Sequence, residues 1–288
     1  MKKIEFLNLG NHPITNSYLS IKKPKKEFLY NLKLIYHSNT KLISLGKFVS
    51  PKKMFNNKYA HRASASKTMR SAYEKLAKSL IKTYNPQSIL EIGSNDGCFI
   101  KHFKKINNIG VEPCKNLADI TAKMRIKTYP NFWTKKLSKK IINENGLFDI
   151  IYSANTISHI HNLKETFNAI EISLKNGGIF ILEDPSLLEA LKKNSYDQFY
   201  DEHAYVFSLT ALKNLTKKTG LEIFKVEKLN THGGSNRVFF KKKTNLKLQI
   251  SKQYIKSLLD EKKFGIEKLS TYRKFAKNVK KSKNALIS

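Results

Sequence analysis

The stretch Ser88 to Phe99, with the sequence SILEIGSNDGCF, constrains the fold of this chain more than any other. A short apolar run typical of a β-strand stops at Gly93, small residues follow, and a helical pattern comes next. Strand, tight turn and helix form the unit that presents free backbone N–H groups to a ligand in doubly wound α/β proteins. The stretch therefore predicts a ligand-binding turn at the carboxyl end of a buried strand.

The spacing of the acidic and glycine residues indicates the ligand. Gly93 and Gly97 lie four residues apart, whereas dinucleotide-binding turns need the pattern G-x-G-x-x-G. Glu91 adds a carboxylate beside the turn, which suits a cationic ligand. Glu112 ends the next predicted strand, where a carboxylate can accept both hydroxyls of a ribose. The pattern favours S-adenosylmethionine, a positively charged nucleoside, over a dinucleotide.

The length and the cysteine content bound the class of protein. The 288 residues suit one large domain plus a smaller one. No apolar run approaches the roughly 18 residues of a membrane span, so we expect a cytoplasmic protein with no membrane partner. Cys98 and Cys114 are too few for a disulfide framework or a cysteine-based zinc site, and we expect two buried thiols.

The charge is strongly positive, with 54 lysine and arginine residues against 22 acidic ones and a formal net charge of +32. Such a charge attracts polyanions in general, including RNA, anionic lipid or a nucleotide diphosphate. The lysines are spread over the chain without the arginine and aromatic interleaving that binds bases. We therefore do not expect nucleic acid as a partner, and we interpret the charge as a property of solvated faces.

The order of the periodic segments predicts an α/β fold. Residues 1–60 hold short apolar pieces separated by Gly, Pro, Asn and Lys, typical of a small β-rich module. A helical pattern follows and ends at Pro86. Strands then alternate with helices up to a closing antiparallel pair, the layout of a Rossmann-like domain over residues 61–245. Residues 246–288 predict one or two lysine-rich helices, interrupted near Gly265. The predicted strands of the main domain are SILEI, NIGVEP, Arg125 to Tyr129, LFDIIYSA, GGIFILEDP, LEIFKVEKL and NRVFFKK.

A second group of reactive residues lies between the fifth strand and the next helix, in the segment NSYDQFYDEHAYVF. Carboxylates beside His203 would raise its pKa or fix its tautomer, as a general base near neutral pH requires. The alternative is a helix-capping region whose polar groups are all paired. After the fourth strand, His159 is expected to face the ligand and His161 the surface. The segment THGGSNRVFF, with His232, could be a further part of the site or a plain hairpin turn.

The series EIGSNDG, GVEP, ANTISHI, EDP, YDQFYDEHAYVFSL and HGGSNRVFF, in this order and spacing, resembles the S-adenosylmethionine-dependent C-methyltransferases of deoxysugar biosynthesis. The similarity runs from about Phe6 to Lys283. It implies a class I methyltransferase domain, S-adenosylmethionine as cofactor, and methylation of a nucleotide-linked 4-keto-deoxysugar at the carbon beside the ketone. An O- or N-methyltransferase acting on another small or saccharide substrate, and an RNA methyltransferase, remain as alternatives.

The resemblance also implies roles for individual residues. His203, held by Glu202, is the expected base, and Tyr200 or His159 would stabilise the enolate oxygen. A tyrosine from the segment before the core corresponds most nearly to Tyr59. The implied catalytic residues are His203, Glu202, Tyr200, His159 and Tyr59. The implied cofactor-binding residues are Glu91, Gly93, Ser94, Asn95, Gly97, Glu112, Pro113, Asn131, Phe132, Ala154 and Asn155.

The chain departs from the family pattern at both ends. The paired cysteines of the family's N-terminal zinc module are absent, so no metal is expected and residues 1–60 are interpreted as a remnant of that module. The family continues into a second Rossmann-like domain, which we expect to be missing after Ser288. That domain helps to hold the sugar nucleotide in relatives, so the acceptor stays open and a partner chain could supply the domain.

Overall fold

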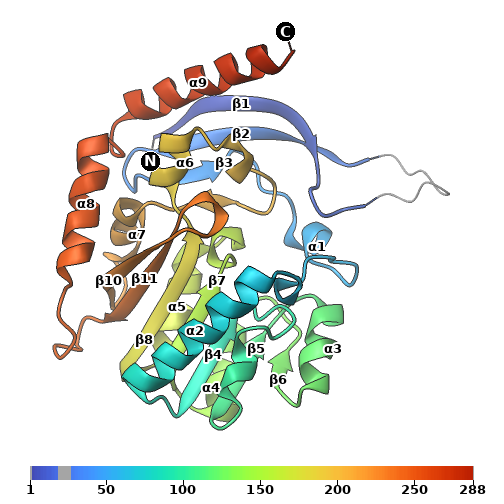
Figure 1. Ribbon diagram of the computed structural model, residues 1–288, viewed down its shortest axis with the longest axis vertical. Helices are drawn as coiled ribbons and strands as arrows, with labels where there is room; N and C mark the ends of the chain where they lie inside the picture. Colours follow the sequence, from blue (N-terminus) through green and yellow to red (C-terminus); the bar gives the residue numbers. More distant parts are fainter. Residues whose placement is uncertain (1, 19–26, 288) are drawn as a thin grey trace.

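Seven strands form the central sheet of the computed structural model, which describes residues 2–18 and 27–287 (Figure 1). Their order across the sheet is β10-β11-β8-β7-β4-β5-β6. Strands β4 to β8 run parallel, whereas β11 pairs antiparallel with β8 and β10 with β11. The predicted Rossmann-like class I methyltransferase fold is therefore confirmed. The strands are β4 (Ser88–Ile92), β5 (Asn107–Val111), β6 (Lys127–Tyr129), β7 (Phe148–Ala154), β8 (Leu174–Pro185), β10 (Leu221–Leu229) and β11 (Ser235–Lys242).

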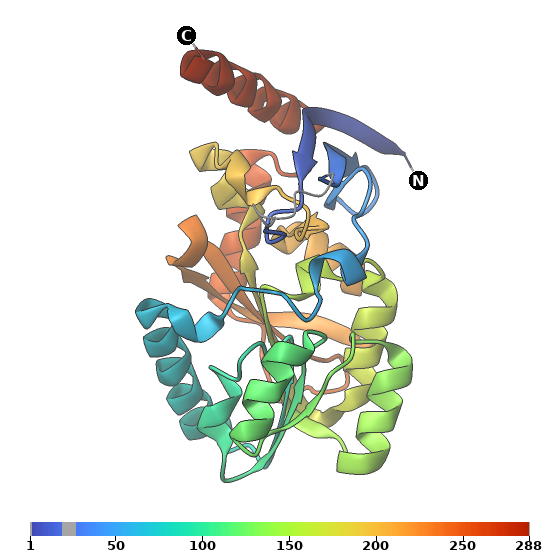
Figure 2. The same ribbon diagram turned by 90° about the vertical axis from the view of Figure 1, so that its right-hand side faces the viewer.

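Helices cover both faces of this sheet (Figure 2). α2 (Lys67–Tyr84) packs on one face, and α4 (Lys135–Asn145) and α5 (Leu163–Ser173) pack on the other. Ser66 caps the start of α2 with its side chain, and Asn85 ends the helix in a left-handed conformation just before the predicted proline stop. α3 (Lys115–Lys123) and α7 (Leu209–Thr216) also lie beside the central sheet. α1 (Pro51–Met54) and α6 (Leu187–Lys193) pack instead in a second hydrophobic cluster, described below.

Two predicted elements differ from the structure. The prediction of an α-helix after the glycine turn is wrong, because the chain there forms a four-residue 3-10 helix, η2 (Ile100–Phe103). The buried carboxylate of Glu91 accepts the amide of Ile100 at 3.1 Å and so caps this single turn. The strand expected from Arg125 begins at Lys127, because Arg125 takes a left-handed backbone conformation with φ of 61°.

The β-rich module expected for residues 1–60 belongs to a second sheet, with strand order β1-β2-β3-β9 in the described part of the chain. Three strands come from this segment, β1 (Lys3–Pro13), β2 (Leu29–His37) and β3 (Ile43–Leu45). The fourth, β9 (Tyr205–Val206), comes from the segment after β8 and pairs antiparallel with β3. The small sheet therefore includes part of the tyrosine- and carboxylate-rich segment.

The tail forms two helices on either side of Gly265, as predicted. α8 (Lys252–Phe264) packs against β10 and α7, and α9 (Leu269–Ile287) lies along β1 at the top of Figure 1. Tyr272 of α9 is fully buried, and its hydroxyl donates to the carbonyl of Ile266. Within the described residues, none of the helices is long and apolar enough to cross a bilayer.

One hydrophobic cluster joins the three segments that the sequence analysis treats as separate units. It contains Leu34 of the N-terminal segment, Leu187 and Val206 of the main domain, and Tyr272 of the tail. The boundaries at residues 60 and 245 stay a prediction. The packing, however, makes the small sheet and its covering helix continuous with the main domain.

Glu261 of α8 anchors the start of α7. Its buried carboxylate accepts the amides of Leu209 and Thr210 and the hydroxyl of Thr210, at 2.7, 2.8 and 2.6 Å. We expect Glu261→Gln to lower the free energy of unfolding by about 2 kcal/mol in urea denaturation, because hydrogen bonds to a charged acceptor are lost. Asp260→Asn on the same helix is the control and should cost less than about 0.5 kcal/mol. Equal losses for both variants would contradict the anchoring role.

Candidate active site

Backbone geometry requires glycine at the turn after β4. Gly93 has φ of +76°, and a Cβ atom there would lie 2.0 Å from Oγ1 of Thr156. The amides of Gly93 and Ser94 both donate to the carbonyl of Val111, at 2.8 and 3.1 Å. These bonds tie the turn to the end of β5 and bring the ends of neighbouring strands close together.

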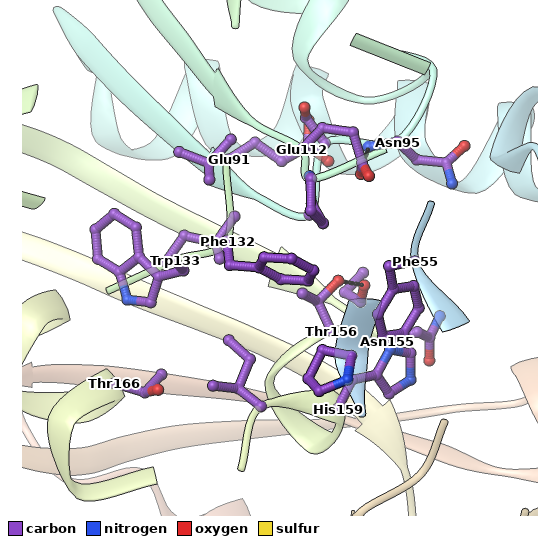
Figure 3. Close-up of a pocket in the computed structure, with 18 of the residues that line it drawn as sticks. Phe55, Glu91, Asn95, Glu112, Phe132, Trp133, Asn155, Thr156, His159 and Thr166 are labelled. Atoms are coloured by element: carbon purple, nitrogen blue, oxygen red, sulfur yellow. Dashed lines mark hydrogen bonds between the residues drawn. The ribbon is translucent and has the colours of Figure 1, made fainter. Parts of the chain in front are cut away.

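A cavity of about 430 Å³ opens at the carboxyl ends of β4, β5 and β7 (Figure 3). Ligands of doubly wound folds bind at this edge of the sheet. In Figure 3, Glu91, Glu112 and Asn95 lie on one side of the cavity, and Phe55 and His159 lie on the other. The predicted cofactor residues that line it are Glu91, Gly93, Ser94, Asn95, Glu112, Pro113, Phe132, Ala154 and Asn155.

Two predicted cofactor residues lie outside the cavity lining. A Cβ atom at Gly97 would lie 2.9 Å from Cγ2 of Thr121, so this glycine shapes the turn instead. Asn131 is exposed in the loop after β6. Trp133, in the same loop, lines the cavity, although the sequence analysis missed it. Its position beside the predicted residue Phe132 was the available signal.

Two buried carboxylates face the cavity from adjacent strands. Glu112 accepts the amide of Asn95 on Oε2 at 2.9 Å and the amide of Cys114 on Oε1 at 2.8 Å. Burial raises the pKa of Glu112, and these backbone bonds oppose the rise. Burial also raises the pKa of Glu91 well above its usual value. A cation bound nearby would favour the ionised form of both groups. Cys98 and Cys114 are buried, as expected.

The unpaired polar atoms at the cavity test whether the expected cofactor fits. Within the described residues, Ser94 Oγ, Trp133 Nε1 and His159 Nε2 are buried and have no hydrogen-bond partner. Buried polar groups are nearly always paired, so a bound ligand is expected to complete them. S-adenosylmethionine carries donors and acceptors on its base, its ribose and its amino acid part. The residues present therefore fit this cofactor.

The five residues predicted as catalytic come from three segments of the chain and gather beside the cavity. Tyr59 and His159 line it. The Tyr59 hydroxyl donates to Oε2 of Glu202 at 2.9 Å, and the rings of His159 and His203 stack with centroids 5.3 Å apart. The Tyr200 hydroxyl lies 3.1 Å from Nε2 of His203. Tyr200, Glu202 and His203 thus lie behind the two residues that face the cavity.

The prediction that neighbouring carboxylates raise the pKa of His203 is wrong. Burial lowers the pKa of this imidazole to about 4. The neighbouring carboxylates do not offset burial because their side chains turn away, that of Asp201 to Thr15 and that of Glu202 to Asn16 and Tyr59. Nδ1 of His203 lies 2.7 Å from the carbonyl of Gln198. Since a carbonyl can only accept, Nδ1 carries the proton and the lone pair lies on Nε2.

Asp184 and Ser158, which the sequence analysis did not select, position His159. The short helix η3 (Ile157–His159) carries this histidine. The Ser158 hydroxyl donates to Oδ1 of Asp184 at 2.7 Å, so η3 is tied to the end of β8. Burial raises the pKa of Asp184 to about 7. The ring of Phe55, also missed, stacks on His159 at 5.5 Å and fixes the other side of the imidazole.

The remaining two histidines differ in their surroundings. The prediction that His161 lies at the surface is wrong. Its ring stacks on that of Phe48, with centroids 4.5 Å apart, and the residue lines the cavity. The segment around His232 forms the turn between β10 and β11, which was one of the two interpretations of the sequence. His232 has φ of 51°, and its Nε2 lies 3.3 Å from Nδ2 of Asn155. The turn therefore reaches the rim of the cavity.

Comparison with known proteins gives two family matches and one curated relative. Residues 59–226 match a methyltransferase domain, and residues 230–288 match a C-methyltransferase C-terminal domain. The chain is 26% identical over 279 residues to the C-methyltransferase NovU of Streptomyces niveus. The aligned region covers 95% of this chain and 66% of NovU, so the chain spans just under two thirds of that relative.

Two solved structures are similar to this chain at low sequence identity. The PH0226 protein of Pyrococcus horikoshii has a TM-score of 0.50 and 18% identity, covering 67% of this chain and 96% of that protein. An S-adenosylmethionine-dependent methyltransferase of Clostridium acetobutylicum has a TM-score of 0.47 and 16% identity, covering 60% and 91%. The match over residues 59–226 spans more than half of the chain. The chain therefore belongs to the methyltransferase-domain family, and its cofactor is S-adenosylmethionine.

Proposed function

We propose that the chain transfers a methyl group from S-adenosylmethionine to the carbon beside the ketone of a nucleotide-linked deoxysugar. One observation carries this proposal: Tyr59 and His159 line the cavity, and Tyr200, Glu202 and His203 lie directly behind them. Methylation of carbon requires a base that removes a proton and donors that stabilise the resulting enolate. The cluster contains groups of both kinds. The C-methyltransferase match and the similarity to NovU support methylation of carbon.

The cofactor would be held by the groups that line the cavity. Glu112 would accept the ribose hydroxyls, and Ser94 and Trp133 would pair with other polar atoms of the ligand. S-adenosylmethionine supplies an electrophilic methyl group on a sulfonium sulfur. Glu91 would lie beside that positive charge, which favours the ionised form of its carboxyl.

His203 is the proposed base. Its Nδ1 proton is fixed by the Gln198 carbonyl, and its low pKa keeps the imidazole neutral near pH 7, so that Nε2 can accept a proton. Because His203 does not line the cavity, the proton beside the ketone would reach Nε2 through the Tyr200 hydroxyl, which lies 3.1 Å from Nε2 and donates its own proton to it. His159, which lines the cavity, would donate to the enolate oxygen. Burial keeps both donors in their neutral forms.

Replacement of Glu112 tests the cofactor site. We expect Glu112→Gln to weaken S-adenosylmethionine binding by about tenfold or more, because the amide loses one acceptor oxygen facing a backbone N–H and the ribose. Isothermal titration calorimetry measures the effect. Glu144→Gln, at an exposed position on α4, is the matched control and should bind as wild type. Full affinity in Glu112→Gln would remove this residue from the cofactor site.

Replacement of His203 tests the base. We expect His203→Gln to reduce turnover by about 10²–10⁴-fold, the usual contribution of a general base, while cofactor affinity stays within about twofold. Steady-state kinetics and calorimetry measure the two effects. The control is His102→Gln on η2, outside the cavity lining, which should keep full activity. Undiminished turnover in His203→Gln would exclude the imidazole as the base.

The acceptor itself can be tested with a nucleoside-diphosphate 4-keto-deoxysugar. We expect NMR of the product to place the new methyl group on the carbon beside the ketone. In D2O without the methyl donor, the wild-type protein should exchange the proton on that carbon, and His203→Gln should exchange it far more slowly. A methyl group on oxygen or nitrogen, without such exchange, would favour an O- or N-methyltransferase instead.

A further inference from the structure

Two consecutive residues of the N-terminal segment, Thr15 and Asn16, form hydrogen bonds with residues 200–203 after β8, called here the reactive segment. Thr15 donates from its amide at 3.1 Å and its hydroxyl at 2.6 Å to Oδ1 of Asp201. Asn16 donates from Nδ2 to Oε1 of Glu202 at 2.6 Å. The other oxygen of Glu202 accepts the hydroxyl of Tyr59 at 2.9 Å. Both oxygens of this buried carboxylate are therefore paired, each with a different segment of the chain.

The small sheet also holds the backbone on both sides of these carboxylates. The amide of Leu45 in β3 donates to the carbonyl of Ala204 at 2.9 Å, just before β9 joins the sheet. On the other side, Phe199 packs in the cluster of the small sheet, 5.8 Å from the ring of Phe275 in α9. Residues 200–203 are thus positioned by the N-terminal sheet as much as by the main domain.

We propose that Asn16 is a positioning residue of the active site, which holds Glu202 ionised and directs its carboxylate to Tyr59. The inference rests on the proposed function, because Tyr59 lines the cavity and would face the acceptor. While Glu202 accepts the Tyr59 proton, the lone pairs of the Tyr59 oxygen can accept a hydroxyl of the sugar. A protonated Glu202 could donate to Tyr59 instead and would reverse this bond. The N-terminal module therefore acts on the reaction, beyond its interpretation as a remnant.

Several titratable groups face Glu202 from the elements around it. Burial raises its pKa, the bonds from Asn16 and Tyr59 lower it, and the charge of Asp201 raises it. Tyr200 and Cys114 also face Glu202, and both have raised pKa values, so they are neutral near pH 7. Hydrogen bonds to the charged form favour that form. Loss of the Asn16 donor should therefore make Glu202 harder to ionise.

Titration of the side-chain carboxyl groups, followed by ¹³C NMR, tests whether Asn16 favours the ionised form of Glu202, and it needs no acceptor. Glu202 is identified by the signal missing from Glu202→Gln. We expect the titration midpoint of Glu202 to rise by about one pH unit in Asn16→Leu and in Asn16→Ala, and to stay near the wild-type value in Asn16→Gln. Asn11→Leu in β1, at an exposed position, is the matched control and should leave the midpoint unchanged.

Kinetics with the 4-keto-sugar nucleotide give the second readout. In Asn16→Leu, kcat/KM should fall by about tenfold at neutral pH, with its acid limb moved to higher pH and unchanged S-adenosylmethionine affinity. Asn16→Gln should restore most of the activity. If the titration midpoint of Glu202 does not rise in Asn16→Leu, the proposal is overturned. It is also overturned if the midpoint rises while the pH profile of kcat/KM stays unchanged. No turnover by the wild type, together with a moved midpoint, would reject the acceptor while the Asn16–Glu202 link stands.

Discussion

The pairing of β9 with β3 is the constraint on which the candidate active site depends. β9 begins two residues after His203, so the register of this short pair sets the position of the reactive segment. Two paired residues contribute little by themselves. The cluster that joins α6, α9 and the small sheet supplies the apolar burial that holds the pair in place. The reactive segment is therefore held by a packed scaffold.

Burial, more than surface charge, determines the electrostatics of the site. The chain carries a net charge of +32, yet the groups that face the cavity include the buried carboxylates Glu91 and Glu112. Burial raises the pKa values of these acids and lowers those of His159 and His203. The site thus favours neutral side chains until a charged ligand enters. A cationic cofactor beside carboxylates is consistent with this arrangement.

The five polar residues beside the cavity are arranged in two layers. Tyr59 and His159 face the cavity, and the residues behind them fix their orientation. Glu202 accepts the proton of Tyr59, while Asp184 holds the short helix of His159 through Ser158. Each cavity-facing group is thus oriented by a buried carboxylate, which restricts its geometry before any ligand binds.

The sequence alone determined the elements whose cause is local. The apolar run before Gly93, the left-handed turn at that glycine, the helix stop near Pro86 and the break at Gly265 all follow from neighbouring residues. The parallel direction of β4 to β8 followed from the alternation of strands and helices. The gathering of the predicted cofactor residues along one cavity was expected for the same reason, because parallel strands end at one edge of the sheet.

Only the tertiary structure decided the contacts between distant segments. The bonds of Thr15 and Asn16 to Asp201 and Glu202 join residues 186 positions apart, and no local pattern marks them. The pKa of His203 was mispredicted for the same reason. Carboxylates adjacent in sequence turned to partners in the N-terminal segment, and burial, a property of the whole fold, then dominated. Local sequence determines conformation, but burial and side-chain direction depend on everything that packs around a residue.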